Sequence, residues 1–285
     1  MGYGSMGKRH AENARALGHD VRIYDPFLVE GCGTEAEALD AASADAVVIA
    51  SPARHHIRQA KLVAGRGIPV LVEKPLGTDR ELLAAYALPC GEPLVAVGYN
   101  LRLHDGVRVL RELLPRLGRL SSALVQLRCD MSSWPGGAYE DMLLEGSHEI
   151  DLALHLVGSA TVAGAIGAGR AWTVLLHHVD GAASAIQLDG AACGTYLRRA
   201  SVFGDAGMLT WAWGGPPSWG WTVGGRVSGD VVSESGATTP DATYAAELSD
   251  FLAGGGWCCT LAEGLAVLEV CARARQLAGG DDDAQ

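Results

Sequence analysis

The chain opens with three glycines, Gly2, Gly4 and Gly7, which stand before a helical segment in the spacing GxGxxG. Glycines at these positions let the backbone turn tightly and approach a phosphate group at the helix N-terminus. The pattern is typical of the link between a buried parallel strand and a helix. Taken alone it also fits an ordinary glycine turn before any helix, so the residues that follow have to support it.

Strand and helix signals alternate through the first hundred residues. The expected strands are 20–25, 44–50, 69–73 and 94–98, and the expected helices are 10–17, 34–42 and 56–64. The last three strand segments are almost continuously apolar, as expected for parallel strands buried on both faces. Repeated strand–helix–strand units imply a doubly wound parallel sheet with helices on both faces.

The pattern changes after about residue 118. A glycine-rich stretch, 162–232, holds short strand-like segments, which favours an antiparallel sheet. Further strand signals lie at 123–128, 172–178, 184–188 and 208–213, and helical signals lie at 105–114, 147–156, 244–252 and 261–277. We therefore expect an α/β chain: a Rossmann-type domain over residues 1–117, then an α+β domain with an open antiparallel sheet over residues 118–285.

The strand that should precede the glycines is missing from the sequence, because only Met1 stands before Gly2. In a doubly wound sheet this strand is central and pairs on both sides. Its neighbours should then lose backbone partners, at about 1–3 kcal/mol for each buried amide left unpaired, and the glycine turn should lose its anchor. We expect the natural protein to carry several more apolar residues before Met1. The alternative is a truncated, inactive paralogue.

Composition narrows the class of protein. The formal net charge of −11 argues against nucleic acid or an anionic membrane as partner, since both need a basic face. No apolar run reaches the length of a membrane span. The seven cysteines form no CxxC pair, which favours reduced thiols in a cytoplasmic protein, and no spacing predicts a metal site.

Two positions bear on cofactor choice and chemistry. Asp25 ends the expected second strand, where a carboxylate accepts hydrogen bonds from ribose hydroxyls and repels a 2′-phosphate. No arginine follows it, so NAD fits better than NADP. Lys74, in Glu73-Lys74-Pro75, follows a buried strand, at the sheet edge that faces the ligand crevice. There it can polarise a substrate oxygen, although a surface lysine at a strand end is the plainer alternative.

A third motif begins the helix expected after residue 146. Glu145, His148 and Asp151 recur at spacings of three, which places them on one side of a turn or helix start. Histidine is the natural proton acceptor near neutral pH, and flanking carboxylates can orient its ring. The same residues also fit a capped helix start, with Ser147 as N-cap and acids near the positive end of the helix dipole.

These motifs, in this order, resemble the glucose–fructose oxidoreductase / inositol dehydrogenase (Gfo/Idh/MocA) family. Three further segments resemble that family over essentially the whole chain: Ala50-Ser51-Pro52 followed by His55 or His56, residues 97–104 (VGYNLRLH), and residues 241–252 (DATYAAELSDFL). The resemblance implies a Rossmann domain that binds NAD(P) and a second domain that binds substrate and forms homodimers or homotetramers. It further implies hydride transfer at a carbinol or keto carbon of a sugar, nucleotide sugar or cyclitol.

Carried over by position, the resemblance assigns roles to individual residues. Lys74 is the expected catalytic lysine, His148 the acid/base, and Glu145 stands where many relatives have aspartate. The expected cofactor contacts are Gly2, Gly4, Ser5, Met6, Gly7, Asp25, Ser51, Pro52, His56, Glu73 and Lys74. The expected substrate contacts are Asn100, Arg102, Trp134, Tyr139 and His148, with Trp134 fitting a core position equally well.

The chain departs from the family pattern between Tyr139 and His148, where it is shorter than in relatives linked to surface-sugar biosynthesis. Two other functions share the same resemblance. Some relatives use NAD transiently to cleave a glycoside, and some bind a dinucleotide as sensors without turnover. Intact Lys74 and His148 argue against the sensor.

Overall fold

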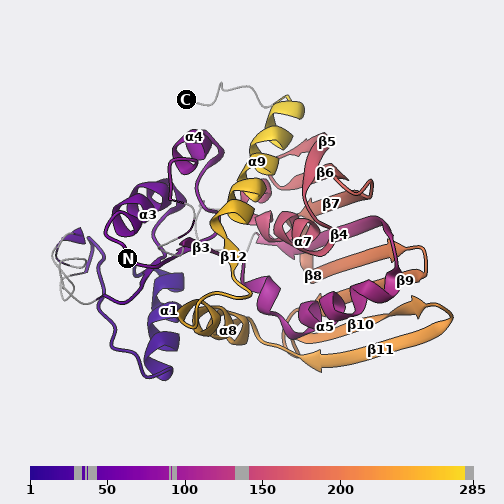
Figure 1. Ribbon diagram of the computed structural model, residues 1–285, viewed down its shortest axis with the longest axis horizontal. Helices are drawn as coiled ribbons and strands as arrows, with labels where there is room; N and C mark the ends of the chain where they lie inside the picture. Colours follow the sequence, from indigo (N-terminus) through magenta and orange to yellow (C-terminus); the bar gives the residue numbers. More distant parts are fainter. Residues whose placement is uncertain are drawn as a thin grey trace. The chain divides into compact units, whose positions relative to one another are not determined.

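The computed structural model describes residues 1–28, 34–35, 37, 44–89, 91, 95–131 and 141–279. The chain divides into two compact units (Figure 1). The first comprises Met1–Leu103 with Pro240–Leu268, and the second comprises His104–Thr239 with Glu269–Gln285. The sequence placed the division near residue 117, whereas the folded chain has 104–117 in the second unit and returns a late helical segment to the first.

The described part of the first unit contains a four-stranded sheet in the order β1-β2-β3-β12. Its strands are β1 (Val47–Ile49), β2 (Val70–Glu73), β3 (Val95–Gly98) and β12 (Cys259–Thr260). The first three are parallel, with Val48 opposite Leu71 and Leu71 opposite Ala96, and β12 runs antiparallel to β3. Every residue of β2 and β3 is buried, as their continuous apolar runs predicted. The parallel Rossmann sheet is confirmed.

The expected strand at 20–25 is wrong, because these residues are extended but belong to no strand of the sheet. A strand needs a continuous row of partners, and the backbone bond from Gly2 N–H to the Tyr24 carbonyl, 2.8 Å long, is a single rung. The expected helix at 34–42 lies almost wholly outside the described residues.

Helices of the first unit surround this sheet. They are α1 (Ser5–Ala16), η1 (Ala53–His55), α3 (His56–Ala64), η2 (Asp79–Glu81), α4 (Leu82–Ala85), η3 (Asn100–Leu103), α8 (Pro240–Leu252) and the first half of α9 (Leu261–Leu277). Helix α1 begins five residues earlier than expected, because the glycine turn leads straight into it. Helix α8 packs against α1, and its Leu248 and Phe251 join Leu71 and Ala96 of the sheet in one hydrophobic cluster.

The second unit contains an eight-stranded sheet in the order β11-β10-β9-β8-β4-β7-β6-β5. The strands are β4 (Leu120–Asp130), β5 (Ala160–Ala168), β6 (Ala171–His178), β7 (Ala183–Asp189), β8 (Ala191–Gly204), β9 (Gly207–Gly214), β10 (Gly220–Val227) and β11 (Asp230–Ala237). The sheet was expected to be antiparallel, but β4 and β7 pair in parallel, so it is mixed.

One face of this sheet is covered by helices. Buried and exposed residues alternate along β6, with Trp172, Val174 and Leu176 buried and Leu175 exposed. Helices α5 (Asp105–Leu113), α6 (Met142–Glu145) and α7 (Ser147–Val157), with η4 (Leu114–Leu117), contact these strands (Figure 1). The alternation follows from this one-sided cover.

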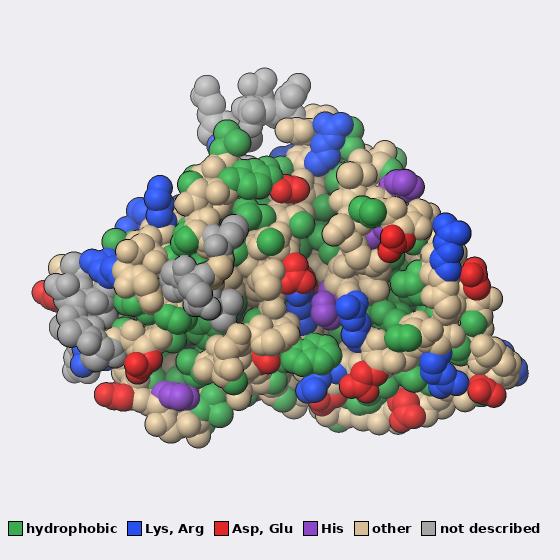
Figure 2. All heavy atoms as spheres, viewed as in Figure 1, with side chains coloured by type: hydrophobic (Ala, Val, Ile, Leu, Met, Phe, Trp, Pro, Cys, Tyr) green, Lys and Arg blue, Asp and Glu red, His purple; other side chains and the backbone are tan. Residues whose placement is uncertain are grey.

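In the part of the chain that the structure describes, the helices are all too short or too polar to cross a bilayer. Acidic and basic side chains lie interspersed on the face shown in Figure 2.

Candidate functional site

The three glycines at the start of α1 have different spatial constraints. Gly2 has a φ of +86°, which favours glycine. A Cβ on Gly7 would lie 2.0 Å from the Gly2 carbonyl oxygen, so only glycine fits there. A Cβ on Gly4 would meet no described atom within 4 Å. Open space at Gly4, together with a helix start that no side chain caps, is what a phosphate cradle requires.

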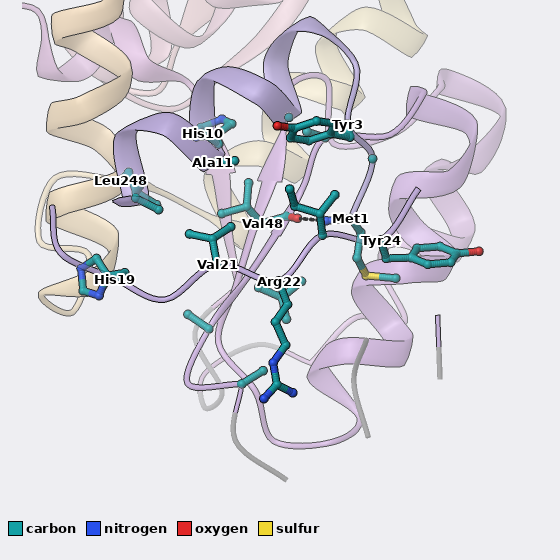
Figure 3. Close-up of a pocket in the computed structure, with 18 of the residues that line it drawn as sticks. Met1, Tyr3, His10, Ala11, His19, Val21, Arg22, Tyr24, Val48 and Leu248 are labelled. Atoms are coloured by element: carbon teal, nitrogen blue, oxygen red, sulfur yellow. Dashed lines mark hydrogen bonds between the residues drawn. The ribbon is translucent and has the colours of Figure 1, made fainter. Parts of the chain in front are cut away.

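The glycine turn is anchored on both sides, contrary to the expectation from the sequence. The Met1 amino group donates to the Val48 carbonyl at 2.7 Å (Figure 3), and Ala50 N–H donates to the Met1 carbonyl at 2.8 Å. Gly2 N–H donates to Tyr24 on the other side. Met1 therefore occupies a strand position beside β1 and holds the turn in place.

A cavity of about 310 Å³ lies next to this anchor (Figure 3). It separates residues 19–24 from residues 44–48 and reaches the apolar side chains of Leu248 and Phe251. Asp25 and Lys74 do not line it. The cavity therefore lies apart from the residues proposed to react.

Asp25 stands beside the glycine turn. Its carboxylate accepts hydrogen bonds from Tyr3 N–H at 2.7 Å and from Phe27 N–H at 2.9 Å. The first bond ties the carboxylate to the turn that would hold a pyrophosphate. Asp25 thus lies where a carboxylate can meet the ribose attached to that pyrophosphate, and the residues present fit a dinucleotide.

His56 was expected to contact the cofactor, but it connects two turns instead. Its Nε2 lies 2.7 Å from the Ser51 carbonyl and its Nδ1 lies 2.8 Å from the Pro75 carbonyl. The ring is almost completely buried, and burial lowers the pKa of His56 despite these carbonyl partners. Its effect on a ligand is therefore indirect, through the backbone that it fixes next to Ser51 and Lys74.

Lys74 is half-buried and directly follows the last residue of β2, Glu73. Hydrogen bonds fix the side chain of Glu73. The Glu73 carboxylate lies 2.6 Å from His10 Nε2, and its other oxygen accepts from Lys74 N–H at 3.2 Å. Burial alone would raise the pKa of Glu73, but the hydrogen bond and charge of His10 lower it. Glu73 is thus held as a buried carboxylate directly next to the lysine.

Asn100 and Arg102 were expected on the substrate side, and the structure buries both within the first unit. Asn100 Nδ2 donates to Thr243 Oγ1 of α8 at 2.9 Å. Arg102 forms an ion pair with Glu263 of α9 at 2.7 Å. Burial opposes ionisation of Glu263, but Arg102 lowers its pKa. Both side chains therefore fasten late helices to the Rossmann unit.

His148 and Glu145 belong to the second unit. Glu145 ends α6, Gly146 intervenes, and α7 begins at Ser147, so the two side chains do not share one continuous helix. Ser147 is fully buried within α7 and is not its N-cap, which is Gly146. A Cβ on Gly146 would lie 2.7 Å from Leu188 of β7, so this tight approach fixes the helix start that carries His148.

A buried ion pair that the sequence reasoning missed lies next to His148. Glu149 is fully buried and pairs with Arg198 of β8, whose guanidinium also donates to the Tyr196 hydroxyl at 2.9 Å. Burial opposes the charge, but Glu149 and Tyr196 raise the pKa of Arg198. This pair fixes α7 on the sheet. A glutamate on the apolar face of a helix was the available signal, since such a residue needs a partner.

The remaining expected substrate residues, Trp134 and Tyr139, lie outside the described residues. The structure brings together the glycine turn, Asp25, Ser51, Glu73 and Lys74 in the first unit. Glu145 and His148, which are neighbours in the sequence, both belong to the second unit.

Residues 1–87 match the Gfo/Idh/MocA family, described as "Oxidoreductase family, NAD-binding Rossmann fold". The match covers the glycine turn, α1, β1 and β2, and it supports the predicted family, the oxidoreductase class and the NAD-binding Rossmann domain.

Curated relatives are similar over part of their length. Inositol 2-dehydrogenase of Mycolicibacterium gilvum (strain PYR-GCK) is 32% identical over 180 residues, which cover 55% of this chain and 51% of that protein. Rhizopine catabolism protein MocA of Rhizobium meliloti is 28% identical over 246 residues, covering 72% and 76%. The chain thus spans about half the length of the first of these relatives.

Solved structures share the fold over nearly the whole chain. Levoglucosan dehydrogenase in complex with NADH has a TM-score of 0.83 at 18% identity, covering 98% of this chain and 95% of that one. UDP-N-acetylglucosamine 3-dehydrogenase GnnA from Acidithiobacillus ferrooxidans has a TM-score of 0.80 at 20% identity, covering 98% and 96%. The shared fold extends through both units.

Proposed function

We propose that this chain is an NAD-dependent oxidoreductase that transfers a hydride to or from a secondary alcohol or ketone of a sugar, nucleotide sugar or cyclitol. One observation carries the proposal: Lys74, one of three lysines in the chain, stands at the carboxyl end of a buried parallel strand beside a clamped carboxylate. In a doubly wound sheet this edge faces the ligand crevice. Relatives named inositol 2-dehydrogenase support the substrate class.

Residues of the first unit are proposed to bind the cofactor and the substrate oxygen. The turn of Gly2, Gly4 and Gly7 would hold the pyrophosphate of NAD at the start of α1, and Asp25 would hold the adenosine ribose. When bound, NAD supplies the hydride-accepting nicotinamide. The Lys74 ammonium donates a hydrogen bond to the substrate oxygen and stabilises the negative charge that develops on it.

The family resemblance assigns the transfer of the proton to His148. The His148 imidazole takes the hydroxyl proton in oxidation and returns it in reduction. Glu145, which precedes it by three residues, supplies negative charge that favours the protonated ring. These two roles rest on the family resemblance.

A homo-oligomer built through the sheet of the second unit also belongs to the proposal. Ile166 of β5 is 80% exposed and Val231 of β11 is 69% exposed, which are large values for apolar side chains. Molar mass measured by light scattering tests this part independently, and a monomer at assay concentration would contradict it.

Replacing Lys74 by methionine tests the enzymatic role. With myo-inositol, levoglucosan or UDP-N-acetylglucosamine plus NAD, we expect the wild type to form NADH. In Lys74→Met the rate of NADH formation should fall by a factor of about 10²–10⁴. The affinity of this variant for NAD should change by no more than a few-fold. Lys61→Met, an exposed lysine of α3, is the matched control and should keep full activity.

Two results would contradict the proposal. Near-normal kcat in Lys74→Met would make Lys74 an ordinary surface lysine. Tight NAD binding without turnover of any of these compounds would favour a dinucleotide sensor over an enzyme.

A further inference from the structure

Three ionisable side chains from distant parts of the sequence meet in the interior of the first unit. They are His10 of α1, Glu73 of β2 and Glu247 of α8, and they are 3%, 5% and 0% exposed. One donor atom from each lies within 4.8 Å of those of the other two. The cluster therefore joins the helix after the glycine turn, the strand that ends at Lys74 and a helix from the end of the chain.

Within this cluster His10 and Glu73 lie at hydrogen-bond distance, and Glu247 lies next to them. His10 Nε2 and Glu73 Oε1 are 2.6 Å apart, which is shorter than two ligands around a shared metal ion. Two carboxylates and one imidazole in a dry interior need protons shared among them, because unbalanced buried charge is strongly unfavourable. The surroundings add further contacts, since the His10 ring meets the edge of Tyr244 with centroids 5.8 Å apart.

This network acts directly on the backbone of Lys74. Glu73 precedes Lys74, and its second carboxylate oxygen accepts from Lys74 N–H. On the other side of the lysine, His56 of α3 lies at hydrogen-bond distance from the Pro75 carbonyl. Lys74 thus lies between two contacts: the Glu73 carboxylate, which pairs with His10 of α1, and the contact of His56 of α3 with Pro75.

We propose that His10, Glu73 and Glu247 are positioning residues for Lys74, which they hold at the end of β2 by linking it to the helix of the glycine turn. The inference rests on the proposed function of Lys74, adds His10 and Glu247, to which the sequence motifs assign no role, and gives Glu73 a positioning role. Occupation of the glycine turn is thereby coupled to the placement of the reacting ammonium group through His10.

The three lysines of the chain permit a test that needs no substrate. Reductive methylation at pH 8 followed by mass spectrometry gives a labelling rate for Lys74, with exposed Lys8 and Lys61 as internal references. In His10→Ala and Glu247→Gln, the end of β2 loses part of the support that the buried cluster gives it through Glu73. The Lys74 labelling rate relative to that of Lys61 should rise by at least about threefold, since a less firmly held segment opens more often to the reagent.

Two variants separate positioning from general stability. His10→Gln keeps a donor for Glu73 and should restore labelling toward the wild-type rate. Asp241→Asn is the matched control on the same pair of helices, because it breaks the exposed ion pair between Arg9 and Asp241, 2.6 Å long, without touching the buried cluster. It should leave the Lys74 labelling rate unchanged.

The outcomes discriminate clearly. An unchanged Lys74 rate in folded His10→Ala and Glu247→Gln overturns the inference, and so does an equal rise at all three lysines, which indicates partial unfolding. Stabilisation of the wild type, but not of Glu247→Gln, by added Zn²⁺ or Mn²⁺ would show a metal site and also overturn it. NADH formation could be lost in Lys74→Met while the Lys74 labelling rate stays unchanged in His10→Ala and Glu247→Gln. That combination would reject only this inference and leave the proposed function standing.

Discussion

Substituting alanine for Gly4 and for Gly7 separates ligand binding from packing within one six-residue motif. At Gly7 the new Cβ would lie 2.0 Å from the Gly2 carbonyl oxygen, whereas real Cβ contacts essentially never fall below 3.0 Å. Either the turn or α1 must therefore shift by about 1 Å, and overpacking of this kind costs about 1–3 kcal/mol. Gly7→Ala should lower the free energy of unfolding and weaken NAD binding together.

Gly4→Ala should behave differently. Its Cβ enters open space and its φ of −67° suits alanine, so the free energy of unfolding should change by less than about 1 kcal/mol. The same methyl group stands where the pyrophosphate would approach the helix start. Losing one charge-assisted backbone contact, worth about 1.5–3 kcal/mol, should weaken NAD binding by about 10–100-fold.

Urea unfolding and NAD titration followed by tryptophan fluorescence measure both quantities on the same samples. Gly18→Ala is unsuitable as a control, because Gly18 has a φ of +88°. Gly256, which has open space and no positive φ, provides a neutral Gly→Ala substitution in the same unit. If Gly4→Ala binds NAD as tightly as the wild type, the pyrophosphate does not lie on this turn and the reasoning is refuted.

Three further predictions concern the cofactor, the proton and stability. The wild type should bind NAD more tightly than NADP, and Asp25→Ala should narrow the difference, because the carboxylate that repels a 2′-phosphate is gone; tighter NADP binding by the wild type in parallel titrations would contradict this. His148→Ala should lower kcat by about 10²–10⁴ and flatten its pH dependence, and a still-active variant with an unchanged pH–rate profile would exclude His148 as the acid/base. Burial lowers the pKa of His104 to about 4, so below pH about 6.5 the unfolded chain takes up a proton that the folded chain refuses. The free energy of unfolding should therefore fall by up to about 3 kcal/mol between pH 6.5 and 4, and His104→Asn, which retains an acceptor for the α5 N-cap bond from Gly106, should reduce that slope in urea unfolding; an identical slope would assign the pH dependence to other groups.

Local patterns predicted much of the secondary structure of this chain. Continuous apolar runs gave β2 and β3 as fully buried parallel strands. Helices α3 and α9 have the bounds expected from the spacing of their apolar residues. These features depend on periodicity and on nearby helix-breaking residues, which a short stretch of sequence contains in full.

The candidate site was predicted only in part. The glycine spacing, Asp25 and Lys74 could be proposed from the sequence because each stands at a recognisable strand end or turn, and their roles stay predictions. The actual settings of His56 and Arg102 were not foreseen, because both were taken as ligand contacts and both are fixed inside the first unit. A side chain's partner depends on elements that pack from elsewhere in the chain, and motif spacing does not contain that information.

Residues 20–25 show that local sequence pattern does not determine whether a segment joins a sheet. Its composition is that of a strand, yet strand structure requires a row of partners, and the segment has one rung to Gly2 and faces a cavity. Conversely, the sequence assigned no role to Glu247 within the segment 241–252, and packing of α8 on α1 placed it beside His10 and Glu73. Backbone propensity and apolar periodicity are properties of neighbouring residues, so the chain order alone determined them. Pairing of strands and of buried charges joins residues more than sixty positions apart, as in His10 and Glu73, and only the folded arrangement decided it.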